Sequence, residues 1–430
     1  MNRLLILILS VFLLQACNLG GDREFAPALQ PGFPGAAGMS AERLSRIDTL
    51  LQQAVDQGKI PGAVALVARN GKIVYYRAFG MADNSTGREM TRDAIFRIAS
   101  QTKAITSTAV MMLWEEGRFG LDDPISRYIP EFKDPVVLDT FNESDSSYTT
   151  VPATREITIR QLLSHTSGLG YGAIDGDARF RKIYAKAGII DAFTTEPIQL
   201  GENIKKLAKL PLHFNPGEGY YYSEGLDVLG YLVELVSGMP FDRFLKERIF
   251  DPIGMEDTWF YLPDDRAGRL VSVQYKQEGN WVRYPVDFYD PDYPVKGARS
   301  YFAGGAGLSG TAVDYAMFLQ MYLNNGAYNN TRLLSRTTIK TMMSNQIGDF
   351  WGPDPDSYYG LAFSVVTPKG VQKGGMGSTG TFSWGGYFNT QYFADPEEQL
   401  IGILMKQTQG PVNDDTYGKF KVLVEAAVDD

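Results

Sequence analysis

Strand-forming segments lie at the two ends of this 430-residue chain, and a long stretch with few strand signals separates them. Near the N-terminus, residues 63–69 and 72–79 flank Asn70-Gly71, the strongest two-residue signal for a β-hairpin. The other strand-like segments all follow residue 304, at 359–366, 382–388, 391–394 and 400–405. We therefore expect one antiparallel sheet that is built from both ends of the chain.

Segments with the residue pattern of helices precede and follow these strands in the sequence. Residues 40–55 carry apolar side chains at helical spacing, with Ser40 as a suitable N-cap. Other predicted helices span 312–324, 336–343 and 416–428. We predict an α+β fold, in which the antiparallel sheet is flanked by N- and C-terminal helices. Short helical runs broken by Pro, Gly and Asp predict an inserted, mainly helical subdomain over about 121–295, with a ligand cleft where it joins the sheet.

The composition excludes several classes of function. The formal net charge is −9 and no dense Lys/Arg tract occurs, so we expect no nucleic-acid partner. The two histidines, His165 and His213, limit any histidine-dependent catalyst or multi-histidine metal site. With Cys17 as its one cysteine, the chain cannot form an intrachain disulfide.

The N-terminus has the pattern of an export signal. Residues 4–14 are almost wholly apolar, and the segment ending in Leu14-Gln15-Ala16-Cys17 resembles a bacterial lipobox. We expect a lipoprotein signal peptide at 1–16, lipidation of Cys17, a flexible tether at 17–38 and a folded domain at 39–430. The protein would then be lipid-anchored in the bacterial cell envelope. The alternative is an ordinary cleaved signal with an incidental cysteine.

A Ser-x-x-Lys tetrad opens a predicted helix at residues 100–116. Ser100 and Lys103 lie on the same helix face, one turn apart. A serine hydroxyl needs a neighbouring base to become a nucleophile, and a lysine serves if burial lowers its pKa. Such tetrads arise by chance, often with a solvated lysine. This one is the only Ser-x-x-Lys in the sequence, and its helix is apolar or small on nearly every side.

Three consecutive tyrosines, Tyr220 to Tyr222, follow the turn Asn215-Pro216-Gly217 and precede another predicted helix. Tyrosine clusters most often serve amphipathic packing. A tyrosine directly before a helix also has its phenol free to enter a cleft. Beside a lysine ammonium, its phenolate would be stabilised enough to act as a base.

Two adjacent glycines, Gly385 and Gly386, interrupt the predicted strand at 382–388 directly after Trp384. Glycines weaken a strand, so they often mark a place where another group approaches the backbone closely. A free N–H here could complete an oxyanion hole with the N–H of Ser100. A plain β-bulge is the alternative.

Together these segments resemble the serine β-lactamase-like superfamily, particularly class C β-lactamases and family VIII carboxylesterases. Its three motifs match in order as Ser100/Lys103, Tyr222-Ser223-Glu224 and Trp384-Gly385-Gly386. Other similar stretches are 162–169, 304–308 and 312–323, and the resemblance covers roughly residues 40–430. It implies a β-lactamase/transpeptidase-like fold.

The resemblance also implies a mechanism. Ser100 would attack a carbonyl and form an acyl-enzyme, while Lys103 and Tyr222 share the proton as general base and then general acid. The backbone N–H groups of Ser100 and Tyr387 would hold the oxyanion, and water would release the acid. The substrate would be a small-molecule ester, amide or β-lactam, and the resemblance implies no metal and no organic cofactor.

Two departures from the lactamase pattern favour an esterase. Trp384 and Gly385 stand where lactamases usually have Lys and Thr, which bind the β-lactam carboxylate. An indole lacks a cation's attraction for that carboxylate but supplies a flat apolar wall. Glu224 replaces the usual Asn, and it would alter the lysine's pKa or point into solvent. We assign Trp384, Gly385, Gly386 and Glu224 to substrate binding.

Three alternatives remain beside the carboxylesterase. The same fold could act as a β-lactamase or a D-Ala-D-Ala carboxypeptidase, or as a penicillin-binding lipoprotein that acylates and stalls. A Ser-His-Asp hydrolase is disfavoured because the sequence has no Gly-x-Ser-x-Gly elbow. We accordingly assign structural roles to His165 and His213.

Overall fold

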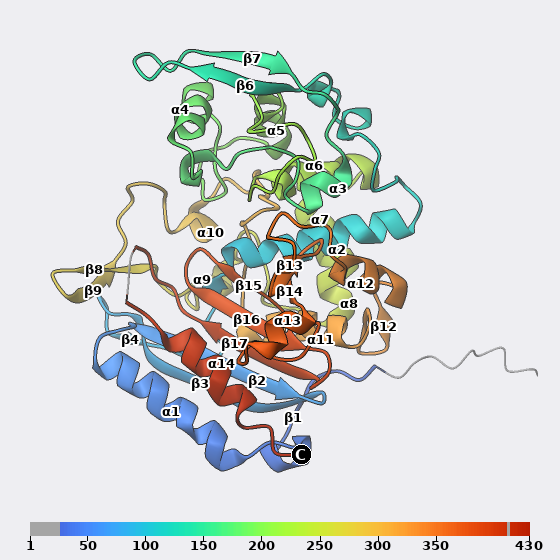
Figure 1. Ribbon diagram of the computed structural model, residues 1–430. Coiled ribbons are helices and arrows are strands. Elements are labelled where there is room, and N and C mark those ends of the chain that lie inside the picture. The colour runs from blue at the N-terminus through green and yellow to red at the C-terminus, as the bar shows by residue number, and fades with distance from the viewer. Residues whose placement is uncertain (1–25, 411–412) are drawn as a thin grey trace, which may run out of the picture.

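The structure, a computed structural model, describes residues 26–410 and 413–430. Its centre is a nine-stranded sheet in the order β1-β3-β2-β17-β16-β15-β14-β13, with β4 paired to β3 (Figure 1). The strands are β1 (Gln30–Pro31), β2 (Gly62–Arg69), β3 (Lys72–Asp83), β4 (Arg88–Glu89), β13 (Ser357–Tyr359), β14 (Ser364–Val366), β15 (Phe382–Gly386), β16 (Thr390–Asp395) and β17 (Leu400–Met405). All neighbours are antiparallel except β1 and β3.

Pairing of β2 with β17 joins the two ends of the chain, as predicted for an α+β fold. The β2–β3 hairpin turns at Asn70 and Gly71, whose φ values are 50° and 73°. Both lie in the left-handed region that a tight two-residue hairpin turn requires.

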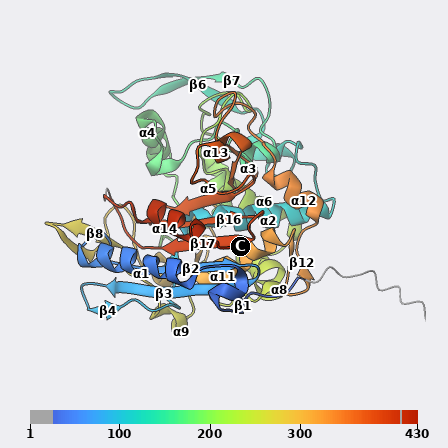
Figure 2. The same cartoon turned by 60° about the horizontal axis from the view of Figure 1, so that its bottom comes forward.

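Both faces of the central strands are buried. Along β2, Ala63, Ala65 and Val67 point into one apolar cluster, and the alternate residues Val64 and Leu66 point into another. The first cluster is covered by α1 (Ala41–Asp56) and α14 (Thr416–Glu425), which pack against each other (Figure 2). Ser40 caps α1 as expected, because its Oγ accepts from the N–H of Arg43.

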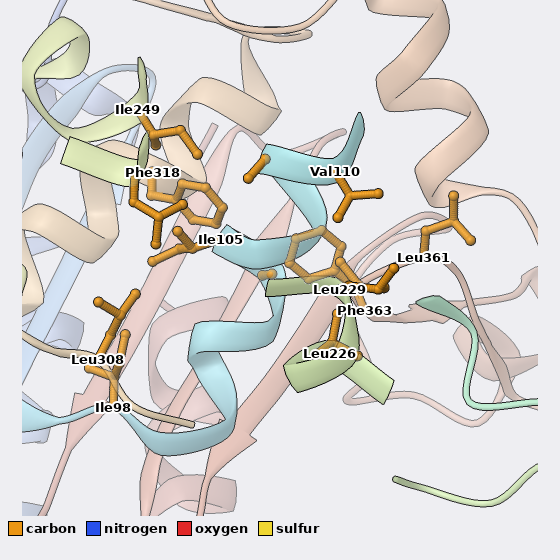
Figure 3. Packing of buried hydrophobic residues seen from close by; sticks show 14 of the residues in the cluster. Ile98, Ile105, Val110, Leu226, Leu229, Ile249, Leu308, Phe318, Leu361 and Phe363 are labelled. Atoms are coloured by element: carbon orange, nitrogen blue, oxygen red, sulfur yellow. The ribbon is translucent and has the colours of Figure 1, made fainter. Parts of the chain in front are cut away.

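The opposite face carries the larger core, built around α2 (Thr102–Glu115), α6 (Gly225–Ser237) and α11 (Ala312–Leu323). Every residue of α2 from Thr102 to Leu113 is buried, which confirms the predicted buried helix. Figure 3 shows this packing, with Ile105 of α2, Leu229 of α6 and Phe318 of α11 in one cluster. α2, the helix that follows Ser100, therefore packs against other parts of the protein on all sides.

The inserted region contains short helices and, unexpectedly, strands. Its helices are α3 (Ile159–Leu163), α4 (Ala178–Ala187), α5 (Leu200–Leu207), α6, α7 (Phe241–Leu245), α8 (Asp251–Ile253), α9 (Asp264–Ala267) and α10 (Tyr293–Lys296). Two hairpins accompany them, β6 (Val136–Phe141) with β7 (Tyr148–Pro152) and β8 (Gln274–Gln277) with β9 (Asn280–Arg283). β7 is exposed along its length, so its sequence lacks the alternation of apolar and polar residues that predicts a strand.

The remaining elements are short or lie after the insertion. They are β5 (Phe96–Arg97) with β10 (Ser309–Gly310), β11 (Ala327–Tyr328) with β12 (Thr331–Arg332), α12 (Arg336–Met343) and α13 (Pro368–Gln372). The single strand predicted at 359–366 is wrong. It is two strands, β13 and β14, whose connecting turn is closed by the bond from the Gly360 N–H to the Phe363 carbonyl.

The predicted tether at 17–38 is also wrong for residues 26–38. Ala26 and Leu29 are buried, β1 pairs with β3, and Pro34–Ala37 forms a 3₁₀ turn. The remaining tether residues, the signal peptide at 1–16 and Cys17 lie outside the described residues, so lipidation stays a prediction. In the described part of the chain, no helix is both long and apolar enough to cross a bilayer.

The glycine pair of β15 permits a close backbone approach. A Cβ on Gly386 would lie 2.4 Å from the carbonyl oxygen of Ile98 and 2.3 Å from the Thr390 Oγ1. One on Gly385 would meet nothing nearer than the Thr390 carbonyl, at 3.2 Å. The group that approaches the strand is thus the chain itself, two residues before Ser100.

Gly386→Ala is expected to lower the free energy of unfolding by about 1–3 kcal/mol, because β15 must move away from Ile98. Gly385→Ala is the matched control and should cost clearly less. Urea unfolding of both variants measures the difference. Equal losses would show that the approach to Ile98 does not constrain the strand.

Candidate active site

Ser100 lies in a 3₁₀ turn, Ala99–Gln101, that runs directly into α2. Ala99 adopts a φ of 44°, a left-handed conformation that costs about 1–3 kcal/mol for a residue with a side chain. Neighbouring bonds hold the turn, since the Ile98 N–H donates to the Leu308 carbonyl at 3.0 Å. Ser100 is only partly exposed, and its position is set by the core rather than by a free loop.

Lys103 follows one turn later and is 1% exposed. Its Nζ donates to the carbonyl of Gly305 at 2.7 Å and to the Oη of Tyr171 at 2.9 Å, and lies 3.5 Å from the Ser100 Oγ. These contacts occupy all three donors of the ammonium group. The predicted pair of Ser100 and Lys103 is therefore brought together by the fold.

Tyr222 joins this pair from the segment before α6. The Lys103 Nζ lies 4.6 Å from the centroid of the Tyr222 ring. The indole Nε1 of Trp384 donates to the Tyr222 Oη at 3.3 Å. The structure thus collects the three predicted motifs around one phenol, although Trp384 contacts Tyr222 rather than standing free as a substrate wall.

Tyr171 is the residue that the sequence analysis missed. Its ring stacks on that of Tyr222 with centroids 5.4 Å apart, and its hydroxyl accepts from Lys103. Burial raises the pKa of Tyr171 well above its usual value, so this phenol keeps its proton at neutral pH. One sequence feature could have pointed to Tyr171, which is its position shortly after the family-like stretch at 162–169.

Both histidines support the site without reaching Ser100. Burial, together with the charge of Lys103, lowers the pKa of His165 well below its ordinary value. Its Nδ1 accepts from the Ser223 N–H at 3.2 Å, and its ring packs 4.6 Å from that of Tyr222. A neutral His165 therefore positions the tyrosine segment.

His213 supports the site indirectly, through Asp175. Its Nε2 lies 3.1 Å from the Oδ2 of Asp175, and its ring stacks on Phe180. The same Asp175 oxygen accepts from the Tyr171 N–H at 2.8 Å. His213 thus helps to fix the backbone that carries Tyr171.

Glu224 neither points into solvent nor lines the cavity, so its assignment to direct substrate binding is wrong. It is 4% exposed and pairs with Asp191, while Asp227 lies near enough to affect both. Burial and these two carboxylates raise the pKa of Glu224 well above its usual value. Its hydrogen bond to Asp191 also raises the pKa of Glu224, and burial raises the pKa of Asp191 above its ordinary value.

A cavity of about 500 Å³ opens beside Ser100. Tyr171, Tyr222, Ala306 and Tyr387 line it at the catalytic end. The rest of the wall is made of Ile174, Ile189, Ile190, Asp191, Ala192, Phe193, Thr194, Thr195, Glu196, Val286, Asp287, Phe288, Tyr289 and Asp290. Trp384, Gly385 and Gly386 do not line it, so their contact with substrate stays a prediction.

The predicted oxyanion groups flank the same cavity. Ser100 and Tyr387 both line it, and Tyr387 directly follows Gly386, which the Ile98 carbonyl approaches. Within the described residues, no group of three or more His, Cys, Asp or Glu side chains is placed to hold a metal ion.

Comparison with known proteins finds a matching family model and several relatives. The family model described as Beta-lactamase matches residues 47–427. Esterase EstB of Burkholderia gladioli is 32% identical over 390 residues, which cover 87% of this chain and 93% of EstB. Lovastatin esterase of Penicillium rubens is 30% identical over 399 residues, covering 87% and 96%. Among solved structures, EstCE1, described as a hydrolase with promiscuous acyltransferase activity, superimposes with a TM-score of 0.75 at 27% identity, covering 90% of this chain and 99% of its own.

The family match contains all three motifs that meet around Lys103. It confirms the resemblance to the serine β-lactamase-like superfamily and the expected fold class. With most of its length covered by the family model, the chain belongs to the Beta-lactamase family and is a serine hydrolase within it.

Proposed function

We propose that the protein hydrolyses carboxylic esters through an acyl-enzyme on Ser100. One observation carries the proposal: the buried Lys103 Nζ lies 3.5 Å from the Ser100 Oγ, at the end of an apolar-walled cavity. A nucleophile beside a buried amine and an open cavity has the parts that acyl transfer needs.

In the first step, the Ser100 Oγ bonds to the ester carbonyl carbon, and its proton passes to the Lys103–Tyr222 pair. The Lys103 Nζ lies 4.6 Å from the centroid of the Tyr222 ring, and the two groups are proposed to share this proton. The leaving alcohol takes this proton as its C–O bond breaks. Trp384 orients the phenol through its bond to the Tyr222 Oη.

The backbone N–H groups of Ser100 and Tyr387 are proposed to hold the oxyanion that forms on the carbonyl. In the second step, water attacks the acyl-enzyme, and the pair takes a proton from that water and returns one to Ser100. Tyr171, which stays protonated, keeps the ammonium in place through its 2.9 Å bond.

Charge favours an ester over a β-lactam. Across the described residues, no lysine or arginine lines the cavity, and Trp384 stands where the lactamase pattern has Lys. A β-lactam carboxylate would lose hydration there without gaining a cationic partner. The esterase relatives EstB and lovastatin esterase support the same choice.

Ser100→Ala should lower the turnover of short-chain p-nitrophenyl esters by at least about 10³-fold, because it removes the nucleophile. Ser107→Ala is the matched control, since it makes the same substitution in α2, which directly follows Ser100, and Ser107 Oγ has no hydrogen-bond partner among the described residues. Initial rates and far-ultraviolet circular dichroism measure activity and folding. Ester turnover retained in Ser100→Ala would end the proposal.

Tyr222→Phe should reduce kcat by about 10²–10⁴-fold, since the phenol holds the shared proton. Trp384→Phe removes the hydrogen bond to that phenol and reduces the ring packed against it, but it keeps the phenol and should cost much less, about 3- to 30-fold. Steady-state kinetics on one ester compare the two. A larger loss in Trp384→Phe than in Tyr222→Phe would contradict the assigned roles.

A chromogenic cephalosporin should be hydrolysed at least about 100-fold less efficiently, in kcat/KM, than the best short-chain ester. The reason is that the cavity offers no cation to the cephalosporin carboxylate. Comparable efficiencies would favour a β-lactamase, and a long-lived adduct without continued product release would favour a penicillin-binding protein.

A further inference from the structure

Two loops of the inserted region form the walls of the cavity beyond the catalytic end. Residues 189–196 connect α4 with α5, and residues 286–290 follow β9. Their apolar side chains include Val286 and Phe288, which are 68% and 51% exposed. Exposed apolar side chains at a cavity mouth indicate that the natural ligand has an apolar body.

Aromatic rings make up much of this wall. The Phe193 ring lies 5.4 Å from that of Tyr289, 5.9 Å from that of Tyr387 and 5.0 Å from that of Phe388. Phe193, Tyr289 and Tyr387 all line the cavity. Ring faces attract cations as well as apolar groups.

The charged groups that line the cavity are all acidic: Asp191, Glu196, Asp287 and Asp290. Lys296 offsets part of one charge, because its Nζ lies 3.9 Å from Asp290 and 3.0 Å from Asp292. Glu196 and Asp287 form no ion pair within the described residues. Glu196 and Asp287 therefore give the wall negative charge that no ion pair among the described residues offsets.

Asp191 lines the same cavity as Tyr171 and Tyr222. Its Oδ2 accepts from the Ala173 N–H at 3.1 Å. Its Oδ1, which is buried and makes no other hydrogen bond within the described residues, faces the carboxyl of Glu224. Asp191 is the member of this buried pair that lines the cavity.

We propose that the substrate is an ester whose apolar part carries a positive charge, such as a protonated amine or a quaternary ammonium group. This rests on the ester hydrolysis proposed above and names its substrate class. The apolar body would fill the space between the two loops. The cation would lie against the aromatic faces, near the carboxylates of Glu196 and Asp287, while an anionic substrate would be repelled.

Three matched p-nitrophenyl esters test this substrate class with the full-length protein. Their acyl chains have equal length and end in trimethylammonium, tert-butyl or carboxylate. The first two differ only in charge, so hydrophobic contact is held constant. We expect kcat/KM to be about 5- to 10-fold higher for the cation than for the tert-butyl ester, and lowest for the anion, with the preference reduced in 1 M NaCl.

The double variant Glu196→Gln/Asp287→Asn should bring the cation-to-neutral ratio of kcat/KM close to one. Asp139→Asn/Glu397→Gln changes the net charge equally at exposed carboxylates outside the cavity wall and should keep the wild-type ratio. Turnover of all three esters with no charge preference, or a ratio unaffected by the cavity variant, would overturn this inference alone. No turnover of any ester would instead overturn the proposed function, and this inference with it.

Discussion

The site depends on one buried ammonium group. A charge that is taken out of water must be compensated by hydrogen bonds, and Lys103 finds its acceptors on three separate segments. These are Ser100 in the turn before α2, Tyr171 after α3, and Gly305 before α11. The hydrogen bonds that compensate the Lys103 charge therefore hold the inserted region against the sheet core. The same hydrogen bonds bring the proposed catalytic groups together.

Close backbone packing supports this arrangement at Gly304 and Gly305. A Cβ on Gly304 would lie 2.4 Å from the carbonyl oxygen of Leu226, and one on Gly305 would lie 2.4 Å from the Oδ2 of Asp227. The Gly305 N–H donates to Asp227 at 3.1 Å, while its carbonyl accepts from Lys103. Burial raises the pKa of Asp227 to about 6, so it is mostly ionised at neutral pH, and Gly305 links it to Lys103 by bonding to both side chains.

The proposed catalytic residues and the cavity wall belong to different parts of the fold. Ser100 and Lys103 lie at the start of a helix that is buried on every side, so their geometry leaves little room for change. The cavity wall, in contrast, comes from loops at 189–196 and 286–290, on the surface of the inserted region. Loops can vary without disturbing the core, which allows one fold to accept different esters.

The sequence predicted the features whose signals are local. Asn70-Gly71 marked the hairpin, the apolar run after Ser100 marked a buried helix, and the spacing of Ser100 and Lys103 placed both on one face. It did not predict that Tyr171 bonds to Lys103, because a tyrosine in a glycine-rich loop has no periodicity to locate it. Glu224 was misassigned because its burial depends on Asp191, a partner from a distant loop.

The cavity could not be predicted from the sequence, since its lining comes from seven separated segments. The most direct test of the central claim is intact-mass and peptide mass spectrometry of the protein, acid-quenched during turnover of a slow ester. The account predicts a mass increase equal to the acyl group on the peptide that contains Ser100. Steady hydrolysis with no such adduct, or an adduct on another residue, would contradict it.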